Sequence, residues 1–265
     1  MPNQRRSEYA RTVRNSRIRH DAKQAIPENA RSRCIVWGCP NKPQMATGTG
    51  LSPRLCQSHL KQRQRHGSPH RKTWPAAELR PYLKSAELWL KQNASQSMVR
   101  AVLARMQSLL DTSGGPETAY ATLRADASRK AKAALAKLRV AGIKAERLVA
   151  IVLATYAIAE DDDSERTLSE FRTVAIGKQA HRLSARWMPE KAKTLPEGSM
   201  ARRTYEKFEH SAGGVLRELG KAIDEAGNLL VDQATVEILE LKRTKFGPHP
   251  SRQVGGEAQG NVRTA

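Results

Sequence analysis

From Trp74 onward, apolar residues recur three and four positions apart, which is the spacing of an amphipathic helix. In the segment that begins at Ser97, for example, Val102, Met106 and Leu110 would line one side of a helix. The same pattern, interrupted by glycine and proline, predicts an all-α body of about six helices. The expected helical segments are 75–89, 97–110, 116–142, 144–160, 164–187, 201–226 and, with a hairpin as the alternative, 229–245.

Burial, kinks and loops within this body can also be predicted from the sequence. Segment 144–160 is apolar on nearly every side, so we expect it to be the central, buried helix. Pro81 should kink or split the first helix, because proline removes a backbone hydrogen bond. The acidic run 161–163 is interpreted as a solvated loop, in which an acid or Ser164 caps the next helix. Residues beyond Gly247 are polar and irregular, which predicts a disordered tail.

Positive charge is concentrated at the start of the chain. The 265 residues carry a net charge of +20, and residues 1–73 hold 16 basic side chains against three acids. No acid lies between Arg31 and Ala77. Such dense like charge repels itself, so we expect contact with nucleic acid, with a solubilising tail as the alternative. The expected parts are a flexible basic arm at 1–33, a module at 34–73, a helical body at 74–247 and a tail at 248–265.

The three cysteines all lie in this basic front, at Cys34, Cys39 and Cys56. With His59 they form a C-x4-C pair and a C-x2-H pair separated by a loop. Two close ligand pairs of this kind are typical of a tetrahedral Cys₃His zinc site, with His66 or His70 as the alternative fourth ligand. Four protein ligands leave no open position, so the expected Zn²⁺ is structural. The odd number of cysteines disfavours a disulfide framework.

These residues resemble the small Cys/His zinc module of phage-encoded HNH-type homing endonucleases and related DNA-binding proteins of phages and mobile elements. The resemblance rests on both ligand pairs and on the turn that follows them, at Gly67 and Pro69. The positions that depart from that family's pattern are Arg54, Leu60, Gln62 and Ser68. The resemblance implies DNA contact in a phage or mobile-element setting, and it does not extend to the helical body.

Arginine and lysine side chains of the arm and the module are the candidate nucleic-acid contacts. They are Arg5, Arg6, Arg11, Arg14, Arg17 and Arg19 in the arm, and Arg54, Lys61, Arg63, Arg65, Arg71 and Lys72 in the module. The arm has too few apolar residues for a core, so we expect it to become ordered on its partner. A second candidate is the helix face formed by Arg124, Arg129, Lys130, Lys132 and Lys137, although most such faces are only solvated.

No convergent catalytic set accompanies these features. An HNH nuclease site needs a histidine base, a pair of strands and a metal-binding histidine on the next helix, yet the histidines after His70 are isolated. The expected function is therefore non-catalytic DNA binding in the recombination, replication or transcription of a phage or mobile element. The alternatives are a divergent nuclease or recombinase subunit and a duplex-RNA-binding protein.

The expected partner is duplex DNA, bound by a homodimer or within a larger nucleoprotein complex. A membrane partner is not expected, because the longest apolar stretch, 148–159, is shorter than the roughly 18 residues that cross a bilayer. The first residues lack the apolar core of a secretory signal. The expected location is therefore the cytoplasm, in association with the nucleoid.

Overall fold

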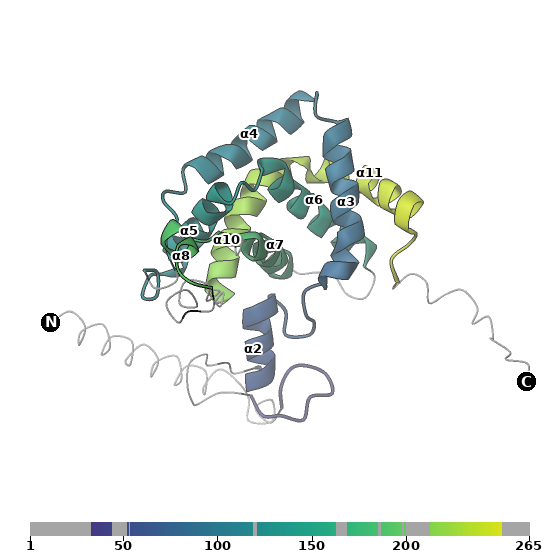
Figure 1. Ribbon diagram of the computed structural model, residues 1–265. Helices are drawn as coiled ribbons and strands as arrows, with labels where there is room; N and C mark the ends of the chain where they lie inside the picture. The colour runs from purple at the N-terminus through teal and green to yellow at the C-terminus, as the bar shows by residue number, and fades with distance from the viewer. Residues whose placement is uncertain are drawn as a thin grey trace, which may run out of the picture. The chain divides into compact units, whose positions relative to one another are not determined.

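The computed structural model describes residues 33–43, 52, 54–118, 121–162, 169–184, 187–197, 199 and 213–250 (Figure 1). The chain divides into two compact units, Met1–Lys72 and Thr73–Ala265. In the first unit, the described part includes the loop 33–43, helix α2 (Gln57–His66) and the residues next to this helix, 54–56 and 67–72. The candidate contacts between Arg5 and Arg19 lie outside the described residues.

The second unit is built from helices, as the sequence predicts, and no strand occurs among its described residues. Its helices are α3 (Ala76–Gln92), α4 (Ser97–Asp111), α5 (Ala127–Val140), α6 (Ala145–Asp161), α7 (Ser169–Ser184), α8 (Glu190–Lys193), α10 (Gly213–Gly227) and α11 (Val231–Phe246). A short 3₁₀ turn, η2 (Asn228–Leu230), joins the last two. The mostly-α fold class is therefore confirmed, and the segment with a hairpin alternative is a helix.

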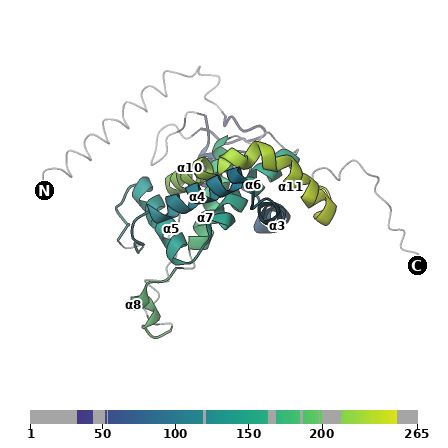
Figure 2. The ribbon, with the colours of Figure 1, turned by 90° about the horizontal axis from the view of Figure 1, so that it is seen from above.

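Helix α6 occupies the centre of the body, which confirms the prediction for segment 144–160. Every residue from Leu148 to Thr155 is buried, and so are Ala157, Ile158 and Asp161. Helices α3, α4, α7, α10 and α11 all pack against it. In Figure 1 the labelled α6 lies among these helices, and Figure 2 shows it between α3 and α10 when viewed from above. Burial of this many apolar side chains on one helix gives the body its core.

Helices α7 and α10 approach each other more closely than any side chain would permit. A Cβ atom added at Gly177 would overlap the carbonyl oxygen of Leu216, and one added at Gly220 would overlap that of Thr173. Glycine at both positions therefore lets the two backbones touch.

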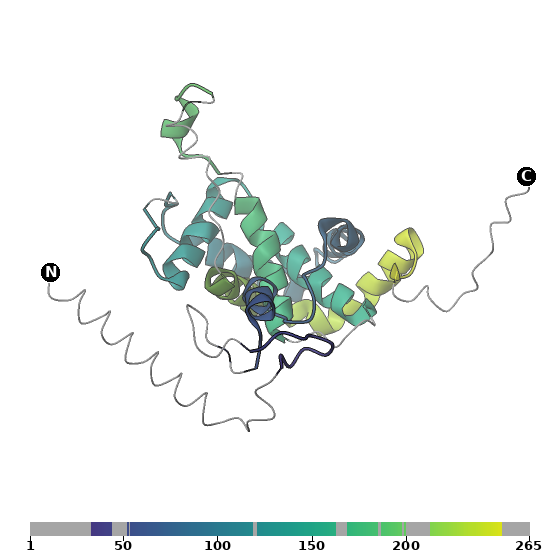
Figure 3. The same cartoon turned by 90° about the horizontal axis from the view of Figure 1, so that it is seen from below.

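Figure 3 shows the same bundle from below, with the short α8 (green) standing away from the other helices.

The start of the third helix and the effect of Pro81 differ from the sequence prediction. The third helix begins at Ala127 rather than at 116, because the Asp126 side chain caps it by accepting the backbone N–H of Arg129 at 2.7 Å. Helix α3 continues through Pro81, so the prediction that this proline splits the helix is wrong. Leu79 and Tyr82 are buried on either side of it in the sequence, and their burial offsets the lost hydrogen bond.

The interpretation of the acidic run 161–163 as a solvated loop is also wrong for its first two residues. Asp161 is the last residue of α6 and is fully buried, and Asp162 is buried next to it. The carboxylate of Asp162 accepts the indole N–H of Trp74 at 2.8 Å. The donors that make this burial possible come from segments distant in the sequence, so the acidic run alone could not reveal them. Asp163 and Ser164 lie outside the described residues.

One residue of the expected tail packs against the body. His249 is buried, and its Nε2 atom lies 2.9 Å from a carboxylate oxygen of Glu78 on α3. The ordered structure thus extends past Gly247, while residues 251–265 lie outside the described part. None of the described helices is both long enough and apolar enough to cross a bilayer.

Candidate metal centre

The four predicted ligands lie on two backbone segments of the first unit. Cys34 and Cys39 belong to the loop 33–43, whereas Cys56 immediately precedes α2 as its N-cap residue. His59 follows three positions later, in the first turn of the helix. Residues three apart lie on the same side of a helix, so this spacing directs both side chains to one place.

The four ligand atoms lie close enough together to surround one metal ion. The Nδ1 atom of His59 is 3.3 Å from Sγ of Cys34 and 3.3 Å from Sγ of Cys56. The Sγ atoms of Cys39 and Cys56 are 3.9 Å apart, and all four ligand atoms lie within 4.8 Å of one another. A zinc ion bound tetrahedrally at the usual bond lengths spaces its ligands roughly 3.5–3.8 Å apart. The cluster could therefore hold a metal ion.

Backbone hydrogen bonds hold the loop in this arrangement. The N–H of Cys34 donates to the carbonyl of Asn41 at 2.8 Å, which closes the loop on itself. The N–H of Ile35 donates to the carbonyl of Arg54 at 2.8 Å, which joins the loop to the segment before α2. Both bonds lie beside a cysteine, so they help to bring the two ligand pairs together.

The thiol groups do not titrate alike. Burial would raise the pKa of Cys56, but hydrogen bonds from the backbone of His59 and from the neighbouring thiols lower it. At Cys39 a hydrogen bond from the backbone of Asn41 would lower the pKa, but burial and the thiols of Cys56 and Cys34 raise it. Metal ligation requires all three thiolates, so binding an ion would release protons from this cluster.

The alternative fourth ligands are not part of the cluster, which contains His59 as its histidine. His66 lies in the last turn of α2, and His70 is exposed beyond the helix. Apart from the four ligand residues, the apolar contacts around the site involve only Val36, Leu55 and Leu60 among the described side chains. A cluster this small cannot stabilise a fold by burial of apolar surface alone.

Basic side chains cover the rest of α2. Lys61, Arg63 and Arg65 are exposed, the helix contains no acidic residue, and none of its residues is fully buried. Lys61 and Arg65 are four positions apart, so their like charges repel each other on one face. Of the remaining predicted contacts in the module, Arg54 and Lys72 are exposed and Arg71 is half-buried. The structure thus places six predicted contacts on one small unit.

The second candidate surface, on α5, is not the uniform basic face that the sequence predicts. The Lys137 side chain is buried, with its ammonium group 5.5 Å from the centre of the Trp187 ring. Arg129 forms a 2.8 Å ion pair with Glu117, which lies outside the helix. The sequence could not reveal either partner, because neither Glu117 nor Trp187 lies on this helix. Arg124 and Lys132 are exposed.

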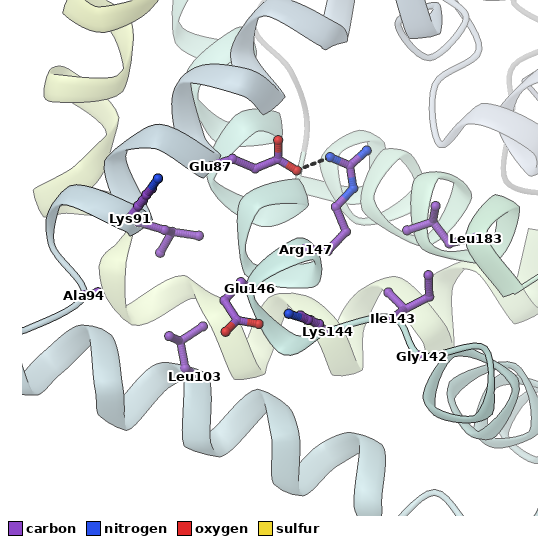
Figure 4. A pocket seen from close by; sticks show the side chains of 11 residues that line it. Glu87, Lys91, Ala94, Leu103, Gly142, Ile143, Lys144, Glu146, Arg147 and Leu183 are labelled. Carbon is purple, nitrogen blue, oxygen red and sulfur yellow. Dashed lines mark hydrogen bonds and ion pairs between the residues drawn. The ribbon is translucent and has the colours of Figure 1, made fainter.

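The body contains an open cleft of about 660 Å³, lined mainly by α3 and by the segment that begins α6 (Figure 4). Arg147 and Glu87 form an ion pair on its wall. Its other charged lining residues are Lys91, Lys144 and Glu146. Aliphatic side chains such as Leu90 and Ile143 also line it. Charges of both signs line the cleft, so they do not indicate one class of ligand.

Comparisons with protein families, with characterised proteins and with solved structures find no match to this chain.

Proposed function

We propose that residues 34–72 form a zinc-stabilised module that binds duplex DNA without cleaving it. The observation that carries the proposal is the position of the ligand cluster. It lies at the N-terminus of α2, and the exposed charged side chains of that helix are all basic. The same four residues that could bind a metal ion therefore anchor the helix that presents positive charge.

Zinc is the metal that fits this ligand set best. Three thiolates and one imidazole are soft and borderline ligands, which favour Zn²⁺ over the hard cations Mg²⁺ and Ca²⁺. Four protein ligands close the coordination shell, so the ion would stabilise the fold rather than activate water. Its binding would supply on the order of 10 kcal/mol toward ordering a module that has almost no apolar core.

Duplex DNA is the partner that fits the charge of this unit. No acidic residue lies between Arg31 and Ala77, so this segment carries a clear excess of positive charge. Phosphates spaced along a duplex would remove the repulsion between Lys61 and Arg65 and release bound counterions. The resemblance of the module to those of phage and mobile-element DNA-binding proteins supports the same choice.

One module of this size spans only a short stretch of duplex. Useful sequence specificity would therefore come from two copies of the chain or from a larger nucleoprotein complex. The body, with its several helices and its low excess of positive charge, is the unit that would mediate such assembly. We include this association in the proposal, together with a role in recombination, replication or transcription.

The proposal is tested by the salt dependence of DNA binding by the full chain. The variant Arg63→Glu/Arg65→Glu reverses two charges on α2, and the matched variant Arg100→Glu/Arg105→Glu reverses two exposed charges on α4. Fluorescence anisotropy with a labelled duplex should show a steep loss of affinity between about 50 and 200 mM salt. The α2 variant should bind at least about tenfold more weakly and with a shallower salt slope, while the α4 variant stays close to wild type.

Equal losses from both variants would contradict the proposal, because binding would then follow total charge and not the module. Competition with duplex RNA at fixed salt identifies the nucleic acid, and equal competition would contradict the choice of DNA. Cleavage of a plasmid in the presence of Mg²⁺ would contradict the non-catalytic part of the proposal.

A further inference from the structure

The loop that carries the first two cysteines exposes a complete tryptophan side chain. Trp37 is 98% exposed, whereas Trp74 and Trp89 in the body are 3% and 1% exposed. Tryptophan has the largest aromatic surface of any residue and is normally at least partly covered. Ile35, two positions earlier, is half exposed as well. An uncovered indole on a loop held by backbone hydrogen bonds indicates a binding surface.

The backbone of the loop explains why the indole points away from the cluster. The N–H of Cys39 donates to the carbonyl of Val36 at 3.1 Å, which closes a four-residue turn. Gly38 has a φ of 73° and Trp37 has a negative φ, as in a type II turn. Trp37 therefore occupies the corner of the turn, between two cysteines of the ligand cluster. The turn holds the backbone at this corner, so the indole extends into solvent and is accessible to a partner.

Among the residues that the structure describes in and beside this loop, the charged side chains are all positive. Arg33 and Lys42, at the two ends of the loop, are exposed. Arg54 is also exposed, and its carbonyl oxygen accepts the hydrogen bond from Ile35. A partner of this surface must therefore combine a flat apolar face with negative charge. A nucleobase joined to its phosphate has both properties.

Base stacking decides whether the indole can contact a paired or an unpaired base. Inside a continuous duplex both faces of each base are already covered by neighbouring base pairs, and insertion of an indole would require unstacking them. An unpaired base at a bulge, a nick or a junction leaves a face available at much lower cost. The exposed indole therefore favours DNA that contains an unpaired base beside a duplex.

We propose that Trp37 stacks on an unpaired base, so that the module binds an interrupted duplex more tightly than a continuous one. This inference rests on the proposed DNA binding, in which the basic side chains of α2 contact the adjoining phosphates. It adds a structural preference to that binding. The recognised feature is the local structure of the DNA and not a base sequence.

The test compares a short continuous duplex with the same duplex carrying a bulge of unpaired thymines. The full-length proteins are wild type, Trp37→Ala, Trp37→Phe and a control, Leu123→Ala, which truncates an exposed apolar residue of the body. Wild type should prefer the bulged DNA. Trp37→Ala should lose roughly tenfold in affinity for it and little for the continuous duplex. Trp37→Phe should retain most of the preference, and Leu123→Ala should retain all of it.

Intrinsic fluorescence gives a readout that does not depend on the alanine variant. Bulged DNA should quench the emission of wild type. Trp37→Phe should abolish most of that quenching, since Trp74 and Trp89 are buried and the half-buried Trp187 belongs to the helical body rather than to the module. If Trp37→Ala binds bulged DNA as tightly as wild type, or the quenching persists in Trp37→Phe, the inference is overturned while DNA binding stands. A docking site for another protein would give this result. If wild type binds neither DNA, the proposed function itself is overturned.

Discussion

The Asp161 carboxylate accepts a hydrogen bond from the ammonium group of Lys242 at 2.9 Å, inside the helical body. Asp161 is fully buried and Lys242 is 3% exposed. The hydroxyl of Tyr82 donates to the same carboxylate at 2.7 Å, and Arg243 donates to its other oxygen at 3.1 Å. This network joins the C-terminal end of α6 to α3 and α11. A carboxylate at the C-terminus of a helix lies at the negative end of the helix dipole, which destabilises it. The hydrogen-bond donors are therefore needed to stabilise the buried carboxylate.

We predict that Asp161→Asn destabilises the protein by about 3–5 kcal/mol, because it leaves the Lys242 charge buried without its counter-ion. Urea unfolding monitored by circular dichroism measures the change. The control is Glu87→Gln, which breaks the exposed ion pair with Arg147 and should cost less than about 1 kcal/mol. Similar small losses from both substitutions would show that the Asp161 network contributes nothing beyond a surface ion pair.

The same carboxylate predicts a dependence of stability on acid pH. Burial would raise the pKa of Asp161, but hydrogen bonds from Lys242, Tyr82 and Arg243 together lower it to about 2. Because the folded-state pKa lies below the ordinary value of 3.8, the contribution is complete above about pH 4 and is lost as the pH falls toward 2. Between these values wild type should lose about 2 kcal/mol more than Asp161→Asn. Parallel pH profiles for the two proteins would refute this assignment.

The close approach of α7 and α10 predicts an unusual sensitivity to a single methyl group. Gly177→Ala and Gly220→Ala should each destabilise the body by about 1–3 kcal/mol, since the added carbon overlaps backbone of the facing helix. Gly214→Ala on α10 is the matched control, because its Cβ would meet only the Ala127 methyl at 3.5 Å. It should be neutral or stabilising by up to about 1 kcal/mol. Thermal unfolding of the three variants measures these differences.

The cluster predicts which histidine ligates the metal ion. His59→Ala should lower the zinc content of the purified chain and loosen α2, whereas His70→Ala should retain the zinc content of wild type. Elemental analysis gives the zinc content, and hydrogen exchange of α2 reports its stability. Retention of a full equivalent of zinc by His59→Ala, with loss of zinc from His70→Ala, would require a rearranged site.

Hydropathy and cysteine spacing reveal a large part of this structure. The apolar run 144–160 predicts the buried central helix, because only a core position accommodates an all-apolar helix. The spacing of Cys34, Cys39, Cys56 and His59 predicts their convergence, since each pair shares one short segment. Both predictions depend on residues that are close together in the sequence.

The features that the sequence does not reveal depend on partners elsewhere in the chain. Asp161 is buried because Lys242 and Tyr82, each about 80 positions away, supply its hydrogen bonds. Lys137 is covered by the ring of Trp187 on a separate segment. The exposure of Trp37 is set by the turn at Gly38, and the only local signal for it is the Trp-Gly pair between two cysteines.

The link between the metal cluster and DNA binding is tested most directly by one titration. Full-length protein is titrated with labelled duplex DNA in its zinc-loaded form, after removal of the metal by a chelator, and after zinc is restored. We predict that affinity falls roughly tenfold or more without zinc and recovers with one equivalent, because α2 then presents its basic side chains again. Equal affinity and equal salt dependence of the zinc-loaded and zinc-free chains would contradict a metal-held DNA-binding module.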